Sequence, residues 1–86
     1  MEIKIEVPKY SPDNGITYRW EEGFEIRTLI DNGKISIIAN QAGLLSLANH
    51  LLNLAQDDIQ SGHHLHFDEH NSLEEGSPEL IIQKKQ

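Results

Sequence analysis

Cysteine is absent from this sequence, so no disulfide and no thiolate metal site can stabilise its fold. Long apolar runs are also missing: the longest, residues 44–55, is broken by four polar residues and cannot span a bilayer. The first residues alternate charged with apolar side chains and lack the features of a signal peptide. These absences predict a cytoplasmic protein that is not inserted in a membrane. Its small core must be stable by itself or be stabilised by binding a partner.

Lysine and arginine are absent from residues 41–83, although the whole chain contains seven of them. We expect this region to project a negative field, which repels nucleic acid and anionic lipid and attracts basic proteins. Solubility alone is the other reading of such a charge asymmetry. The region carries seven acidic residues, namely Asp57, Asp58, Asp68, Glu69, Glu74, Glu75 and Glu79.

The chain has 86 residues, which is short even for one domain, so we expect a single domain over residues 1–86. A domain of this size buries only about 60% of its unfolded surface, which leaves little room for a deep active-site cleft. No cysteine nucleophile, His-Glu-x-x-His helix, phosphate-binding glycine loop or calcium loop is present. The sequence therefore predicts a binding protein without catalytic residues or a cofactor.

The clearest local signal is the pair Asn32-Gly33, which favours the positive φ values of a type I′ hairpin turn. This turn predicts a register in which Ile30 faces Ile35 and the apolar residues of both strands share one side. Alternation of apolar and polar residues predicts further strands at residues 3–7, 64–68 and 80–82, and it admits a short strand at 16–20.

A helix should follow the hairpin, because Asn40 can cap its start and Ser61-Gly62 can stop it. On a helical wheel the leucines and alanines from Leu44 to Ala55 form a broad apolar stripe, which belongs against a sheet. The opposite side of the wheel carries the polar residues Ser46, Asn49, His50 and Asn53.

Together these elements predict an α+β fold. It consists of a small, mostly antiparallel sheet of about five strands in the order β-β-β-α-β-β, with the amphipathic helix packed on one face. The apolar stripe of the helix and the inward residues of the strands should form one core. We expect Leu44, Leu51, Phe67 and Ile37 to pack together in it.

One helix covers one face of such a sheet and leaves the other face open. Leu29 and Ile38 are diagonal neighbours on that open face, so they form a candidate contact patch, through which a homodimer is one option. Trp20 is the most plausible aromatic anchor for a protein partner, because tryptophan is enriched at interface hot spots. Asp57 and Asp58 oppose the dipole near the expected helix end, and a basic partner docking there would relieve this.

Residues 63–70 contain the most conspicuous motif, a run rich in histidine. On a strand, His64, His66 and Asp68 would share a face and could ligate zinc as two imidazoles and a carboxylate. Neighbours on a flat strand tend to splay, so solvated histidines are the simpler reading and we predict no metal site. All five histidines lie in the region without bases, so we expect binding of a basic partner to weaken as the pH falls through about 6.5.

Three segments of the second half carry a family resemblance. They are Gly43-Leu44-Leu45-Ser46-Leu47-Ala48 at the start of the helix, His64-Leu65-His66-Phe67-Asp68, and Leu73-Glu74-Glu75-Gly76-Ser77-Pro78-Glu79-Leu80-Ile81-Ile82. These segments resemble the immunity protein 32 family of bacterial polymorphic toxin systems. The resemblance implies a cytoplasmic bacterial antitoxin that binds and silences a cognate toxin domain.

The resemblance brings no established binding residues with it, so charge and expected exposure select the candidates. Many toxin domains that attack nucleic acid are basic, and an acidic surface would accelerate association with such a partner. A small histidine-rich metal-binding protein and a structural homo-oligomer are the alternative functions. The predicted partner-binding residues are Trp20, Leu29, Ile38, Asp57, Asp58, His64, His66, Asp68, Glu69, Glu74 and Glu75.

Overall fold

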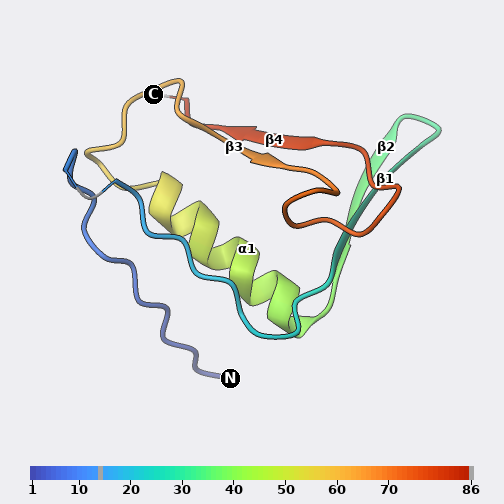
Figure 1. Cartoon of the computed structure of the whole chain (residues 1–86), viewed down its shortest axis with the longest axis horizontal. Helices are drawn as coiled ribbons and strands as arrows, with labels where there is room; N and C mark the ends of the chain where they lie inside the picture. Colours follow the sequence, from blue (N-terminus) through green and yellow to red (C-terminus); the bar gives the residue numbers. More distant parts are fainter. Residues whose placement is uncertain (14, 86) are drawn as a thin grey trace.

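The structure is a computed structural model that describes residues 1–13 and 15–85. In this part of the chain one helix and four strands form, and the strands make two separate antiparallel pairs. Figure 1 shows the β3–β4 pair lying over α1 and the β1–β2 pair projecting at one end of the molecule. The α+β class is confirmed, whereas a single sheet of about five strands is wrong. The elements are β1 (Ile26–Asp31), β2 (Lys34–Ala39), α1 (Gln41–Leu54), β3 (His64–Phe67) and β4 (Leu80–Gln83).

The β1–β2 hairpin has the predicted turn and the predicted register. Asn32 and Gly33 adopt positive φ angles of 50° and 77°, as a type I′ turn requires. Ile30 lies opposite Ile35, and the remaining pairs continue in step to the base of the hairpin. A local turn signal is therefore sufficient to place every residue of both strands.

Residues 3–7, which were expected as a strand, and residues 16–20, where the pattern admitted a short one, belong to no strand of the described chain. The Asn49 side chain of α1 lies between these two segments and bonds to both. Its Nδ2 donates to the carbonyl oxygen of Glu6 at 3.3 Å, and its Oδ1 accepts from the backbone N–H of Arg19 at 2.9 Å. The helix thus supplies bonds that the two segments would otherwise make to each other in a sheet.

Helix α1 begins where it was predicted to begin and ends earlier. The Asn40 side chain accepts a bond from the backbone N–H of Gly43 at 2.8 Å, which confirms the N-cap. The helix ends at Leu54, well before Ser61-Gly62. Asp57 and Asp58 consequently lie in turns beyond the helix rather than in its last turn, so they do not oppose its dipole there.

Helix α1 turns a different side toward the core from the predicted one. Leu44 and Leu51, expected in the core, are 56% and 45% exposed. Asn53 and Ser46, expected in solvent, are fully buried at 0%. The expected packing of Leu44, Leu51, Phe67 and Ile37 is wrong as well, since only Phe67 among them is buried.

Hydrogen bonding explains why the polar side of α1 faces inward. Residues 17–25 run along the helix without a strand beside them, and their N–H groups need acceptors. The Ser46 hydroxyl oxygen accepts from the N–H of Glu21 at 2.8 Å, and the Asn40 side chain accepts from that of Glu25 at 3.0 Å. The centre of the apolar stripe, with Leu44 and Leu51, faces outward as a result, while Leu47 and Leu54 at one edge of the stripe remain buried.

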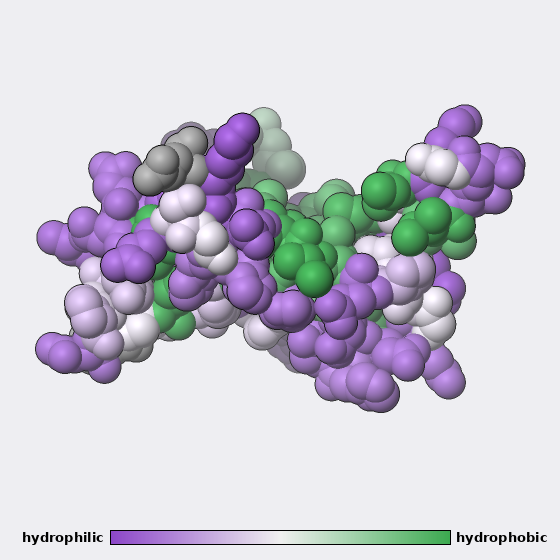
Figure 2. All heavy atoms as spheres, turned by 90° about the horizontal axis from the view of Figure 1, so that it is seen from above, coloured by the Kyte–Doolittle hydropathy of each residue, from purple (hydrophilic) through white to green (hydrophobic). Residues whose placement is uncertain are grey.

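The core lies between the inner faces of α1 and of the β3–β4 pair, with the loops at their ends. Figure 2 shows hydrophobic atoms in the hollow at the middle of the molecule and again on the projecting β1–β2 arm. The first group adjoins the core, whereas the second lies far from it. The buried apolar residues are Ile26, Leu47, Leu54, Ile59, Leu65, Phe67 and Leu73.

Gly43 allows the first turn of α1 to touch the base of the hairpin. A Cβ atom there would lie 2.5 Å from the carbonyl oxygen of Glu25 and 2.9 Å from Cγ1 of Ile26. Both neighbours belong to ordered structure, and the first is a backbone atom. No side chain fits at position 43 without displacing one element from the other.

Gly43→Ala should therefore lower the free energy of unfolding by about 1–3 kcal/mol, measured by urea denaturation. Glycine to alanine within a helix normally raises stability by up to about 1 kcal/mol, so the sign itself is diagnostic. Gln41→Ala, at an exposed position of the same turn, is the control and should leave stability almost unchanged. A Gly43→Ala protein as stable as the wild type would show that the close approach is wrong.

Candidate functional site

The acidic charge of the second half gathers in the loop that joins β3 to β4. We name residues 68–79 the acidic loop. It contains no lysine or arginine. Figure 1 shows this loop beside the β1 strand, at the end of the molecule where the hairpin projects. Its five carboxylates belong to Asp68, Glu69, Glu74, Glu75 and Glu79.

Two of these carboxylates hold the shape of the acidic loop. Asp68 Oδ1 accepts from the backbone N–H groups of His70 and Asn71 at 2.9 and 3.1 Å, which forms a tight turn. Glu69 Oε2 accepts from the N–H of Gly76 at 2.8 Å and so ties the two halves of the loop together. The predicted binding residues Asp68 and Glu69 therefore have structural bonds of their own.

Hydrogen bonds between β1 and the backbone of the acidic loop hold this loop in place. The N–H of Glu74 donates to the carbonyl oxygen of Ile26 at 2.8 Å, and the Thr28 hydroxyl donates to the carbonyl oxygen of Pro78 at 2.6 Å. Leu73 is buried next to Glu74. The loop is thus ordered before any partner arrives, which lowers the entropic cost of binding.

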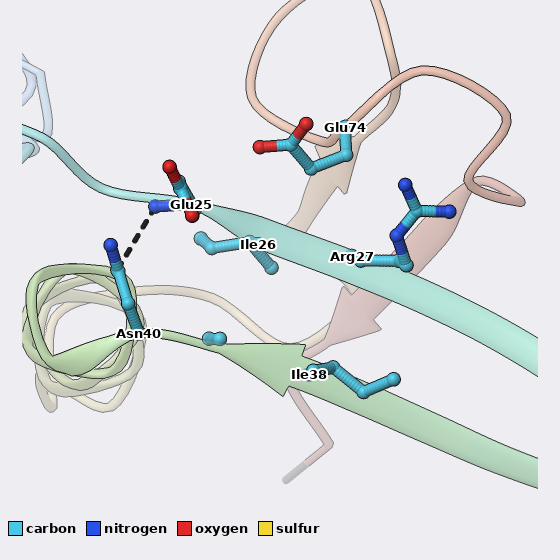
Figure 3. A pocket seen from close by; sticks show the side chains of 7 residues that line it. Glu25, Ile26, Arg27, Ile38, Asn40 and Glu74 are labelled. Atoms are coloured by element: carbon cyan, nitrogen blue, oxygen red, sulfur yellow. Dashed lines mark hydrogen bonds between the residues drawn. The ribbon is translucent and has the colours of Figure 1, made fainter.

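Glu74 and Glu75 are exposed, and neither carboxylate bonds to another described residue. Glu74 borders a surface cavity of about 310 Å³ that Glu25, Arg27 and Ile38 also line. In Figure 3 the side chains of Glu25 and Glu74 lie on the same side of β1, with the Arg27 guanidinium farther along the strand. A basic side chain of a partner would meet two carboxylates at this cavity.

One predicted apolar contact residue, Ile38, lies beside this acidic surface. Ile38 is 55% exposed and lines the same cavity as Glu74. Leu29 is also exposed, on the same hairpin face as Ile38. The expected patch on an open sheet face therefore exists as exposed surface, although it lies on a two-stranded hairpin.

Other predicted residues lie elsewhere on the molecule. Asp57 and Asp58 are exposed in the loop before β3, whereas the acidic loop follows β3, so the two groups of carboxylates are separated by the length of that strand. Trp20 is 37% exposed and packs against Phe24, with ring centroids 4.5 Å apart. The candidates do not form one continuous patch.

His64 and His66 project from the outer face of β3, with ring centroids 4.7 Å apart. His66 Nδ1 lies 3.3 Å from Oε1 of Glu79, and both side chains are exposed. The Asp68 side chain, the expected third ligand, is engaged in the turn that follows. Across residues 1–13 and 15–85, no three His, Cys, Asp or Glu side chains converge in a way that could hold a metal ion.

A buried aromatic cluster around His50 was not anticipated. The His50 ring stacks on Tyr18 at 4.6 Å with an interplanar angle of 9°, and it contacts Trp20 at 4.2 Å. His50 Nδ1 donates to the carbonyl oxygen of Ser46 at 2.6 Å. Burial lowers the pKa of His50, and its bond to Ser46 opposes this only partly. The only signal of this cluster in the sequence was the alternation of Tyr18 and Trp20 with polar residues. This pattern could not show that both rings contact His50.

Burial also raises the pKa of Tyr18, whose hydroxyl is enclosed without a hydrogen-bond partner among the described residues. The cluster forms one wall of a cavity of about 360 Å³, and His64 and His66 line the cavity as well. Tyr18 and Trp20 thus hold residues 16–20 against α1, and Trp20 has a packing role in addition to its exposed edge.

His50 makes stability depend on pH with a definite sign. Its folded pKa lies below the unfolded value, so the unfolded chain takes up the proton first as the pH falls below about 6.5. The stability that His50 contributes is present at neutral pH and is lost as the pH falls from the unfolded pKa toward the folded one. His50→Phe keeps an aromatic ring in the stack and removes the titration.

The free energy of unfolding of His50→Phe should therefore fall less than that of the wild type between about pH 7.5 and 5.5. Urea denaturation at several pH values measures this difference. His70→Phe removes a histidine whose side chain is exposed, and it should retain the wild-type dependence. An equal loss of stability in His50→Phe and the wild type would contradict the role assigned to His50.

The model of one known family, described as Immunity protein 32, matches residues 34–85. The match runs from β2 to the end of β4 and includes α1 and the whole acidic loop. No curated protein and no solved structure matches the chain. No helix in the described part of the chain has the length and apolar character needed to cross a membrane.

Proposed function

The chain belongs to the immunity protein 32 family, and we propose that it binds a cognate toxin domain and neutralises it. The family match over residues 34–85 is the observation that carries this proposal. It agrees with the resemblance found in residues 43–82 of the sequence. Such a protein acts by occupying its partner, so the proposal assigns it no catalytic residue and no cofactor.

The acidic loop is the proposed toxin-binding surface. Its backbone is fixed to β1, while Glu74 and Glu75 point outward without partners among the described residues. An ordered loop that presents unpaired charge can bind without first paying for its own ordering. Negative charge would also steer a basic toxin toward this surface and raise the association rate.

Ile38 and the cavity beside Glu74 extend this surface with an apolar contact. Interfaces commonly combine a desolvated apolar centre with a charged rim, and Ile38 lines the same cavity as Glu25 and Glu74. We infer that a basic side chain of the toxin enters the cavity near Glu25 and Glu74. Nucleic acid and membrane surfaces are not proposed as partners, because the charge of the loop repels both.

Four exposed histidines, rather than five, now support the expected pH dependence of binding, because His50 is buried. His66 lies nearest to the acidic carboxylates, beside Glu79. Protonation of the exposed rings would reduce the negative field that a basic toxin meets. Weaker binding at lower pH therefore stays a prediction of the proposal.

The direct test pairs this chain with a small toxin domain encoded by a neighbouring reading frame, once such a frame is identified. Co-expression should rescue the growth of cells that produce the toxin, and calorimetry should show a salt-sensitive complex. Reversing two charges with Glu74→Lys and Glu75→Lys should weaken binding by about tenfold or more, equivalent to about 1.4 kcal/mol.

The matched control reverses two exposed acids outside the acidic loop, with Glu2→Lys and Glu22→Lys. It changes the net charge equally and should weaken binding much less. Equal weakening by both pairs would show that net charge, and not the acidic loop, governs the interaction. Growth arrest that persists with this chain present would overturn the proposed function itself.

A further inference from the structure

The β1–β2 hairpin carries exposed apolar side chains on both faces, although one face also holds charged residues. On one face Ile30 and Ile35 are 59% and 72% exposed, and on the other Leu29 and Ile38 are exposed as well. Figures 1 and 2 show the hairpin as an arm that projects from the rest of the molecule and carries hydrophobic atoms. An isolated two-stranded ribbon is only marginally stable in water, so this arm is an incomplete sheet.

The two edges of the hairpin differ in their backbone bonding. In this register the backbone groups of Ile26 and Thr28 point away from β2. The acidic loop meets them: Glu74 N–H donates to the Ile26 carbonyl oxygen, and Ser77 Oγ accepts from the Thr28 N–H at 3.3 Å. The outer edge of β1 is therefore already capped near its base.

The outer edge of β2 is open. By the same alternation, the N–H and C=O groups of Ile35 and Ile37 point away from β1. Neither residue bonds in that direction to any described part of the chain. A flat, apolar edge with unpaired backbone groups is a template for another strand.

We propose that a second copy of this chain pairs with the β2 edge, antiparallel, to give one four-stranded sheet in the order β1-β2-β2-β1. The two-fold axis passes midway between the two Ser36 residues, perpendicular to the sheet. Ile35 of each copy then lies opposite Ile37 of the other. The outward groups of these residues face each other and form backbone hydrogen bonds on both sides of the axis.

This register also brings apolar side chains of the two copies into contact. The isoleucines at positions 35 and 37 of both copies fall on one face, where each covers another. Lys34 of one copy lies opposite Ile38 of the other, beside the cavity that Glu25 borders. A slip of one residue would turn the outward backbone groups of one copy against the inward groups of the other.

Charge favours a second copy over a basic toxin at this edge. Residues 26–39 carry two bases, Arg27 and Lys34, and one acid, Asp31, so the hairpin has a net charge of +1 although the whole chain has −7. A basic toxin would find no attraction here, whereas two hairpins meet with only one net positive charge each. Antiparallel pairing also sets the two acidic bodies at opposite ends of the shared sheet.

Analytical ultracentrifugation over a wide range of protein concentration tests this proposal. The wild type should form a dimer, and Ile35→Lys should weaken it by about tenfold or more, because a charged residue on an edge strand opposes pairing. Ile30→Lys is the matched control: Ile30 is the cross-strand neighbour of Ile35 on the same face but lies on β1. It should weaken the dimer much less.

Amide hydrogen exchange on the wild type gives a second readout that needs no variant. Exchange of the Ile35 and Ile37 amides should slow as the protein concentration rises, because only pairing across the edge protects them. A wild type that sediments as a monomer at every concentration would overturn the proposal. So would equal weakening by both lysine variants, or exchange at these two amides that is independent of concentration.

Discussion

Residues 17–25 run beside α1 without a neighbouring strand, and the need to satisfy their backbone N–H groups organises the rest of the structure. Three polar side chains of the helix and its cap, Asn40, Ser46 and Asn49, accept these bonds at 2.8–3.0 Å. The bonds of Arg19 and Glu21 are partly buried, and a buried N–H without a partner costs about 1–3 kcal/mol. Leucine has no acceptor, so turning the apolar stripe of α1 inward would leave several such groups unpaired.

This constraint has consequences on both sides of the helix. Inside, His50 lies beside the same segment and stacks on Tyr18, and burial of the imidazole lowers its pKa. Outside, Leu44 and Leu51 remain exposed, as do all the isoleucines of the hairpin except Ile26. Much of the apolar surface of this small domain is therefore available for contacts with other chains.

Local signals in the sequence were sufficient for the hairpin and for the start of the helix. The turn at Asn32 and the cap at Asn40 each depend on a few adjacent residues, and both predictions are confirmed. Periodicity showed that α1 has an apolar and a polar side, but it could not show which side faces the core. The cavity that joins Ile38 to Glu74 was equally beyond prediction, because it depends on where the acidic loop crosses β1.

The orientation of α1 is tested most directly by comparing the free energies of unfolding of Asn49→Ala and Leu52→Ala. Asn49 is buried and bonded to two backbone segments, so its loss should cost about 1–3 kcal/mol. Leu52 is 47% exposed, and its loss should cost about 0.5 kcal/mol or little more. The reverse order, with Leu52→Ala costing about 2–5 kcal/mol as a core leucine does, would contradict the account.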